Sequence, residues 1–187
     1  MKNNKTLIWT SLVCLIPLVA GAVLYNRLPE TVATHWDMNG VANGWSSRAF
    51  AAFGLPGILF AVNLFVPFAL RTDPKRQNMS PALVSVAQWT VPVVSLLGSG
   101  LTLARALDYE VRVEKIVPAL VGVLFIIIGN FLPKTKQSYT MGIKLPWTLA
   151  SEENWNRTHR LAGFLIPVAL LGLIPAAYSY ILYRRGI

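Results

Sequence analysis

The run Leu120–Gly129, LVGVLFIIIG, carries no polar side chain at any position. A strand of a membrane β-barrel alternates polar and apolar side chains over about ten residues, so this run argues against a barrel. A helix satisfies its own backbone hydrogen bonds, and it therefore suits a continuous apolar run in lipid. The run predicts an all-α fold of membrane-spanning helices.

Apolar stretches of similar character recur along the chain. A helix needs about 20 residues to cross the hydrocarbon layer. Hydrophobic residues make up 54% of the sequence and charged residues only 13%, as expected of a polytopic helical membrane protein. The five predicted spans are Thr6–Tyr25, Ala49–Leu70, Ser85–Leu107, Ile116–Leu132 and Leu161–Tyr183.

The first span follows two lysines and contains Ala20-Gly21-Ala22, a pattern that a cleavable signal peptide shares. Its length of about 20 apolar residues favours a retained anchor instead. Cys14, the single cysteine, lies inside this span and is interpreted as a small apolar filler. One cysteine cannot form an intrachain disulfide.

The positions of lysine and arginine favour a cytoplasmic N-terminus, which places ten of the 17 basic residues inside and seven outside. The pair Arg184-Arg185 then lies outside, so six spans stay open as the alternative to five. The net charge of +9 is spread beside the spans. It predicts contact with anionic lipid headgroups of a bacterial plasma membrane and no direct binding of nucleic acid.

Two regions organise the chain. Residues 1–70 hold the first two spans and, at 26–48, an outer loop with a β-type segment, Thr31–Trp36, followed by Asn39-Gly40 and Asn43-Gly44. Asn-Gly pairs favour tight turns, so this loop predicts a small hairpin-like extracytoplasmic flap. Residues 71–187 form the second region, in which Arg71–Pro81 is interpreted as a plain cytoplasmic connector.

Residues 129–163, called the signature segment below, combine polar, aromatic and turn-forming residues. Pro133 prevents the fourth span from simply continuing. Ser151 can cap a new helix whose positive N-terminal end favours Glu152 and Glu153. We expect this helix to lead into the fifth span. Tyr139, Trp147 and Trp155 are aromatic types that settle at headgroup depth, so the segment is predicted to lie on the inner membrane face.

His35 and His159 are the only histidines, and the predicted topology places them on opposite sides of the membrane. No HExxH zinc-protease spacing is present. Glu152 and His159 are seven residues apart, about 10 Å along a helix axis, too far to share one ion directly. No metal or cofactor is predicted. His159 hydrogen-bonded to backbone, to a carboxylate or to Trp155 is favoured over a metal-binding His159.

The signature segment closely resembles, in order and spacing, the C-terminal signature of SdpI-type membrane immunity proteins. The flap resembles the small N-terminal domain of unknown function that accompanies that signature, through Leu28-Pro29, His35-Trp36, Gly40, Gly44 and Trp45. The residues that carry the C-terminal resemblance are Gly129-Asn130, Leu132-Pro133-Lys134, Tyr139, Gly142-Ile143, Pro146-Trp147-Thr148-Leu149, Ser151-Glu152-Glu153, Trp155, Thr158-His159-Arg160 and Gly163.

The resemblance implies a bacterial plasma-membrane protein that protects its cell from a secreted antimicrobial peptide toxin. In that family a cytoplasmic autorepressor can be a second partner, held at the membrane when toxin is present. Two alternatives stay open: a membrane enzyme that modifies or degrades the toxin, using His159 with Glu152, Glu153 or Asn130, and a small transporter. A homo-oligomer also stays open, because small residues such as Gly98-Ser99-Gly100 permit close helix contact.

Overall fold

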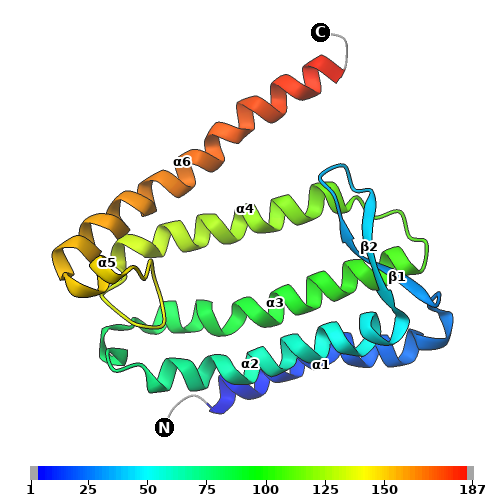
Figure 1. The fold of residues 1–187 in the computed structure, drawn as a ribbon, viewed down its shortest axis with the longest axis horizontal. Helices are drawn as coiled ribbons and strands as arrows, with labels where there is room; N and C mark the ends of the chain where they lie inside the picture. The colour runs from blue at the N-terminus through cyan, green and yellow to red at the C-terminus, as the bar shows by residue number, and fades with distance from the viewer. Residues whose placement is uncertain (1–3, 185–187) are drawn as a thin grey trace. The chain divides into compact units, whose positions relative to one another are not determined.

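The computed structural model describes the backbone of residues 4–184 and the side chains of residues 5–168 (Figure 1). Within that part, four helical stretches are long and apolar enough to cross a membrane: Lys5–Arg27, Phe50–Thr72, Pro81–Ala106 and Val113–Lys134. They confirm the predicted fold class and agree with the first four predicted spans. The chain is a multi-pass membrane protein.

The predicted fifth span, Leu161–Tyr183, lies within α6 (Glu152–Arg184), a single helix of 33 residues. Its side chains beyond Val168 lie outside the described residues, and the backbone of residues 4–184 holds no further helix of that length that could be a sixth span. Ser151 caps α6 as expected, because its hydroxyl accepts a hydrogen bond from the Asn154 N–H at 3.2 Å. The signature segment therefore continues into the last apolar run without a break.

The structure divides into two compact units. The first unit comprises residues 1–72 and 81–117, and the second comprises residues 73–80 and 118–187. Each unit is discontinuous in sequence, because the short connector after the second span belongs with the C-terminal part of the chain. No local pattern in the sequence indicates that residues 73–80 belong to the second unit.

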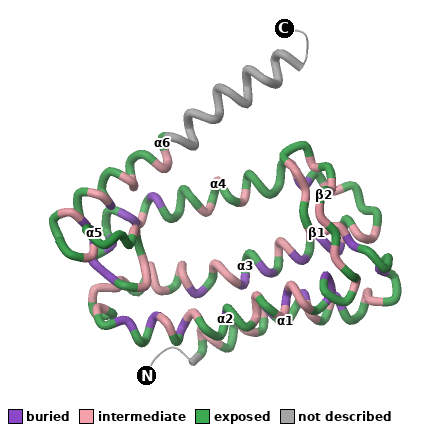
Figure 2. The backbone as a smooth tube through the Cα atoms, viewed as in Figure 1, coloured by how far each residue is buried: buried purple, intermediate pink, exposed green. Residues whose placement is uncertain are grey.

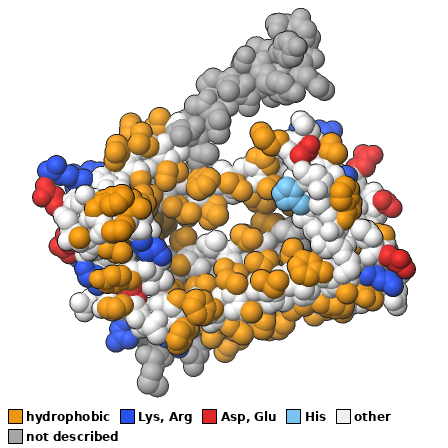
Figure 3. All heavy atoms as spheres, viewed as in Figure 1, with side chains coloured by type: hydrophobic (Ala, Val, Ile, Leu, Met, Phe, Trp, Pro, Cys, Tyr) orange, Lys and Arg blue, Asp and Glu red, His pale blue; other side chains and the backbone are white. Residues whose placement is uncertain are grey.

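The first unit is built on α1 (Asn4–Leu24), α2 (Leu55–Thr72) and α3 (Pro81–Ala106), which pack against one another. Hydrophobic side chains cover much of its surface in Figure 3, as lipid-facing helices require. Its interior is partly polar, since the Asn63 side chain donates to the Ser11 hydroxyl at 3.3 Å. Ser95 and Ser99 are also buried there, and their hydroxyls find no partner among the described residues.

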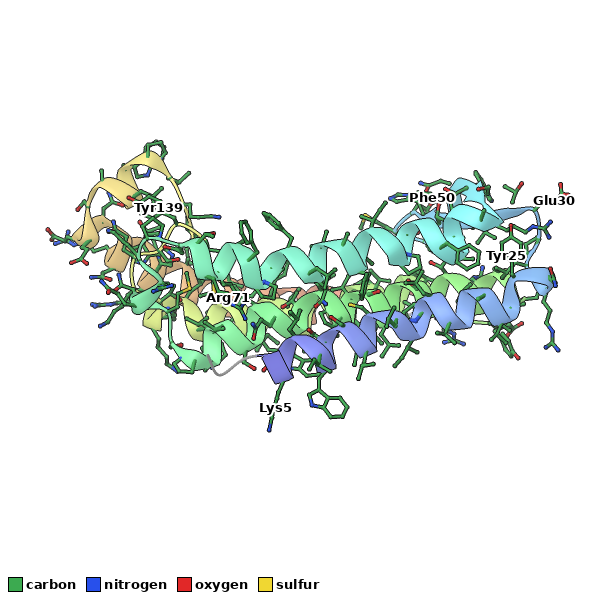
Figure 4. The ribbon with its side chains drawn as sticks, turned by 90° about the horizontal axis from the view of Figure 1, so that it is seen from below. Lys5, Tyr25, Glu30, Phe50, Arg71 and Tyr139 are labelled. Atoms are coloured by element: carbon green, nitrogen blue, oxygen red, sulfur yellow. The ribbon has the colours of Figure 1, made fainter. Side chains whose placement is uncertain are left out.

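One end of the first unit carries an antiparallel hairpin of β1 (Thr31–Trp36) and β2 (Ala42–Ser47). This confirms the small flap predicted from the sequence. In Figure 4, Tyr25, Glu30 and Phe50 mark this end, whereas Lys5 and Arg71 mark the other end. A buried cluster beneath the hairpin anchors it: Leu28, Val32, Ala51, Ala52 and Leu103.

The two Asn-Gly pairs have different roles. Gly40 has a φ of 77° in the turn between the strands, as predicted. Gly44 instead lies inside β2, opposite His35, so the prediction of a second turn there was wrong. A Cβ on Gly44 would lie 2.9 Å from the His35 Cβ. Glycine is needed at this position because the facing histidine leaves no room.

A five-residue π-helix (Phe50–Gly54) joins the hairpin to α2. The sequence predicted an uninterrupted span from Ala49. The structure instead shows a wider helical turn before α2, which the sequence did not predict. Single π-turns inside helices are often found at functional sites. From Leu55 the helix runs through 18 residues to Thr72.

The second unit consists mainly of α4 (Val113–Phe131) from Pro118 onward, a 3₁₀ turn (Leu132–Lys134), α5 (Pro146–Ala150) and α6. The connector also contributes a 3₁₀ turn, Arg76–Asn78. α6 packs on the turn after α4, where a Cβ on Gly163 would lie 2.4 Å from the Pro133 ring. In Figure 2 the buried residues of this unit concentrate around α5 and the loop beside it.

Candidate functional site

A stack of Gly142, Trp155 and His159 forms the centre of the signature segment. Trp155 and His159 are one helical turn apart on α6, and their rings lie nearly parallel with centroids 4.0 Å apart. Both are essentially inaccessible, at 0% and 1% exposure. Gly142 covers them with a φ of 104°, so close that a Cβ would lie 2.5 Å from His159 Nε2. Only glycine fits at this position without displacing the rings.

Both ring nitrogens of His159 are engaged by the protein backbone. Nε2 accepts a hydrogen bond from the Ile143 N–H at 2.9 Å, and Nδ1 is 2.8 Å from the Trp155 carbonyl oxygen. These partners require a neutral imidazole with its hydrogen on Nδ1. Burial lowers the pKa of His159, although the hydrogen bond to Trp155 opposes the shift. His159 thus fastens the loop at Ile143 to α6.

Thr148 and Gln137 hold the loop on its other side. The Thr148 hydroxyl donates to the Ile143 carbonyl at 2.8 Å and accepts from the Leu145 N–H at 2.9 Å. The Gln137 amide donates to the carbonyls of Thr148 and Leu149, each at 2.9 Å. These buried polar groups satisfy the backbone of an irregular segment, which otherwise costs free energy.

The indole N–H of Trp155 adds a further tie. It donates to the Thr135 carbonyl at 2.7 Å, within the turn that follows α4. One α6 side chain therefore stacks on His159 and also fixes the start of the loop. The signature segment is organised around these two aromatic rings.

The connector after α2 supplies the remaining partner of this loop, a buried carboxylate. Asp73 is 5% exposed. Its Oδ2 accepts from the Ser138 hydroxyl at 2.9 Å and from the Thr140 N–H and hydroxyl, each at 2.7 Å. Its Oδ1 accepts from the Lys75 N–H at 2.7 Å. We call this arrangement the Asp73 clasp.

The charge of Asp73 is stabilised by these donors. Burial alone would raise the pKa of the carboxyl, but the hydrogen bonds from Thr140, Lys75 and Ser138 together bring it below its ordinary value. Asp73 therefore remains ionised at neutral pH. The connector is attached a second time at Gln137, whose side chain accepts from Lys75 Nζ and whose carbonyl accepts from the Asn78 amide at 2.8 Å.

The structure brings together four of the residues predicted for the signature site: Gly142, Thr148, Trp155 and His159. Pro133 contacts Gly163 nearby. The others lie at the surface as exposed side chains: Asn130, Lys134, Tyr139, Pro146, Trp147, Glu152 and Glu153. Glu153 forms a helix-surface ion pair with Arg157 at 2.6 Å. The hydrogen bonds of His159 go to backbone groups and not to either glutamate.

Four residues that were not predicted from sequence also stabilise the loop. One is Asp73 in the connector, and the others belong to the loop itself: Gln137, Ser138 and Thr140. The interpretation of the connector as a plain linker was wrong, because the structure makes it part of the site. One hint is present in the sequence, since a polar run, Gln137-Ser138-Tyr139-Thr140, comes soon after a span. No local rule pairs such a run with an aspartate 65 residues earlier.

The hairpin forms a second candidate site, in the first unit. His35 Nδ1 lies 2.5 Å from the Asn43 side-chain oxygen, and both side chains are exposed. Trp45 is exposed at 58% and pairs across the strands with Ala33. Trp36 is only partly exposed. The outward face of the hairpin thus offers one free indole beside a polar histidine–asparagine pair.

Nothing in the described part of the chain resembles a metal centre, because no three His, Cys, Asp or Glu side chains gather there. His35 belongs to the first unit and His159 to the second. With both His159 nitrogens bonded to backbone, no lone pair is left for a metal or for a reacting proton in this arrangement. The geometry favours a binding surface over a catalytic centre.

Comparison with known proteins gives two family matches. Residues 12–60 match a domain of unknown function, DUF1648. Residues 134–185 match the SdpI/YfhL protein family. The first match contains the hairpin, and the second contains most of the signature segment.

The chain is also similar to the immunity protein SdpI of Bacillus subtilis (strain 168). The two are 28% identical over 177 residues, which cover 95% of this chain and 82% of the relative. No solved structure matches the chain. The predicted resemblance is confirmed in both of its parts.

Proposed function

We propose that this chain, which carries an SdpI/YfhL family region behind a DUF1648 domain, is a membrane immunity protein of the bacterial plasma membrane that protects its cell from a secreted antimicrobial peptide. The similarity over 95% of the chain to an immunity protein carries this conclusion. The membrane immunity role follows from that homology.

The site geometry supports protection by binding rather than by chemistry. An enzymatic role would depend on His159, and both of its ring nitrogens are occupied by backbone groups. It is also shielded from solvent at 1% exposure. A general base must reach the proton that it removes, and His159 has no such access. The signature segment is better suited to hold a fixed shape.

The hairpin is the proposed contact surface for the toxin, on the outer side of the membrane. Exposed aromatic side chains on rigid strands favour binding, since they bury large areas at little cost in side-chain entropy. Trp45 has these properties, and the buried cluster around Val32 fixes the hairpin that presents it. Met38, at 95% exposure on the turn, extends the apolar part of this surface.

The inner surface of the signature segment is proposed to bind the second partner, a cytoplasmic repressor. It exposes Tyr139, Trp147 and Lys144. A protein that binds toxin outside and a repressor inside would act as a sensor as well as a shield. Such coupling needs two arrangements of the protein that the toxin binds with different affinities.

The test is survival of toxin-sensitive cells challenged with an SDP-type peptide. Cells express the wild type, Trp45→Ala or Trp9→Ala at matched membrane levels. Trp9 is a suitable control, because its exposure of 62% matches the 58% of Trp45 while it lies on α1. We expect protection by the wild type and by Trp9→Ala, and loss of protection with Trp45→Ala.

Protection by Trp45→Ala would contradict the role of the hairpin. The fate of the peptide separates the remaining functions, and it is followed by mass spectrometry of the culture medium and the cells. Peptide fragments that appear with the wild type and with Trp9→Ala, but not in cells without the protein, would establish an enzyme. In a separate assay the purified protein is placed in vesicles loaded with peptide, and release of intact peptide from them would establish a transporter. Intact peptide retained on the protein supports the proposal.

A further inference from the structure

We infer that the connector between α2 and α3 is a relay, through which the state of the hairpin reaches the signature segment with Asp73 as the point of attachment. This inference rests on the proposed sensor function. It assigns a role to a buried carboxylate that neither family match contains, since the matches cover residues 12–60 and 134–185.

The first step of the relay runs along the continuous backbone from the hairpin to Asp73. β2 ends at Ser47, the π-turn begins at Phe50, and α2 then runs to Thr72, immediately before Asp73. The 18 residues of α2 span about 27 Å and continue directly into Asp73, although Pro67 removes one backbone hydrogen bond inside the helix. A shift or rotation of α2 that starts at the hairpin therefore displaces Asp73.

The second step is the clasp. The carboxylate of Asp73 is held by three donors from Ser138 and Thr140 at 2.7–2.9 Å. Hydrogen bonds weaken steeply as distance and angle depart from their optimum. A displacement of Asp73 must either carry Ser138 and Thr140 with it or release them. In both cases the loop changes.

The third step is short. The Met141 N–H donates to the Ser138 hydroxyl at 3.2 Å, and the next residue is Gly142, which covers the Trp155–His159 stack. Ile143 is bonded directly to His159. The clasp and the stack are thus adjacent along one tight loop. Movement of Ser138 is passed to the face that carries Tyr139 and Lys144.

The connector is also held where a passive linker would not be. Lys75 and Asn78 both bond Gln137, whose amide in turn bonds Thr148 and Leu149. A linker that only joins two spans needs no buried partners 59 to 67 residues away in sequence. The connector therefore binds the start of the loop directly and is linked to its end through Gln137.

The experiment compares hydrogen–deuterium exchange of residues 138–143 in five proteins in lipid nanodiscs without peptide: wild type, Gly44→Ala, Asp73→Asn, the double variant and one control variant. Gly44→Ala disturbs the hairpin, because its Cβ would meet the His35 Cβ. Asp73→Asn keeps the size of the side chain and turns one acceptor into a donor that faces other donors. Asp108→Asn, at an exposed aspartate with a φ of 62°, is the control.

The relay predicts that Gly44→Ala speeds exchange at 138–143 by about fivefold or more, the lower end of typical couplings between sites. In the Asp73→Asn background, Gly44→Ala should add no further change. Asp108→Asn should behave like the wild type. Unchanged exchange at 138–143 in Gly44→Ala, or equal effects of Gly44→Ala with and without Asp73, would overturn the relay.

A second arm adds an SDP-type peptide to the wild type and to Asp73→Asn. Because coupling between two sites is reciprocal, the relay predicts that Asp73→Asn binds the peptide at least as tightly as the wild type, since binding no longer has to release the clasp, and that exchange at 138–143 becomes faster in the wild type alone. Loss of binding in Asp73→Asn would overturn the relay, since the carboxylate would then serve the binding surface itself. Absence of binding to the wild type would refute the proposed function, while the peptide-free comparison still decides the relay.

Discussion

Gly142→Ala should strongly destabilise the second unit. At Gly142 the backbone φ is 104°, which an alanine adopts only with strain of about 1–3 kcal/mol. The added Cβ would also lie 2.5 Å from His159 Nε2 and 2.7 Å from the Trp155 ring. Overpacking of a fixed core costs typically about 1–3 kcal/mol. Together these terms predict a loss of about 2–6 kcal/mol in the free energy of unfolding.

The loss should be visible in the thermal unfolding midpoint of the purified protein in detergent. For a chain of this size, 1 kcal/mol shifts the midpoint by about 2–4 °C, so the expected fall is on the order of 10 °C. Samples are heated to a series of temperatures, and the midpoint is the temperature at which half of the protein still elutes as a monodisperse peak in size-exclusion chromatography. Survival under peptide challenge is measured in parallel, and protection should fall with the folded fraction.

Gly122→Ala is the matched control. Gly122 lies in α4, in the same unit, and an added Cβ meets nothing within 4 Å. Alanine is preferred to glycine inside a helix by about 0.5–1 kcal/mol, so the control should be neutral or slightly stabilising. If Gly142→Ala melted within the error of Gly122→Ala, Gly142 could not lie with a positive φ against the two rings, and the stack of Gly142, Trp155 and His159 would be wrong.

Three further predictions concern the pH response, the indole and the buried hydroxyls. The pKa of His159 is lower in the folded protein than in the unfolded chain, so the unfolded chain takes up a proton at a higher pH. Stability should therefore fall as the pH drops below about 6.5. His159→Gln should remove that part of the fall when thermal unfolding is measured from about pH 8 to about pH 5. Trp155→Phe leaves the Thr135 carbonyl without its donor and should cost about 1–3 kcal/mol, whereas the exposed Trp147→Phe should leave the same melt unchanged. Ser99→Ala removes a buried hydroxyl without a partner in the described part of the chain, so its melt should be equal to or above that of the wild type; a clear loss would mean that the hydroxyl is bonded.

The spans and the hairpin could be predicted from sequence because their signals are local. Continuous apolar runs such as Leu120–Gly129 fix the helices through the cost of unsatisfied backbone in lipid. Thr31–Trp36 followed by Asn39-Gly40 marks a strand and its turn. The second Asn-Gly pair gives a false turn signal, since Gly44 is required by the His35 side chain across the sheet and not by a turn.

The site could be predicted only in part, because only some of its contacts are between residues close together in the sequence. Trp155 and His159 are one helical turn apart, so their contact follows from helix geometry. Asp73 is different, because its partners lie 65 and 67 residues further along the chain. No period or motif in one sequence reports such a pairing. The polar side chains that close the loop therefore acquire a role only once the fold brings them to Asp73.

The distance along the chain between Asp73 and Ser138 also sets an order of assembly. The connector leaves the ribosome well before its partners exist, and α3 and α4 must be made in between. At about 5–20 residues per second, synthesis of the intervening 65 residues takes about 3–13 s. During that interval Asp73 has neither Ser138 nor Thr140 to bind. The clasp closes late, and a nascent chain that stalls in α4 would carry a finished hairpin but no signature loop.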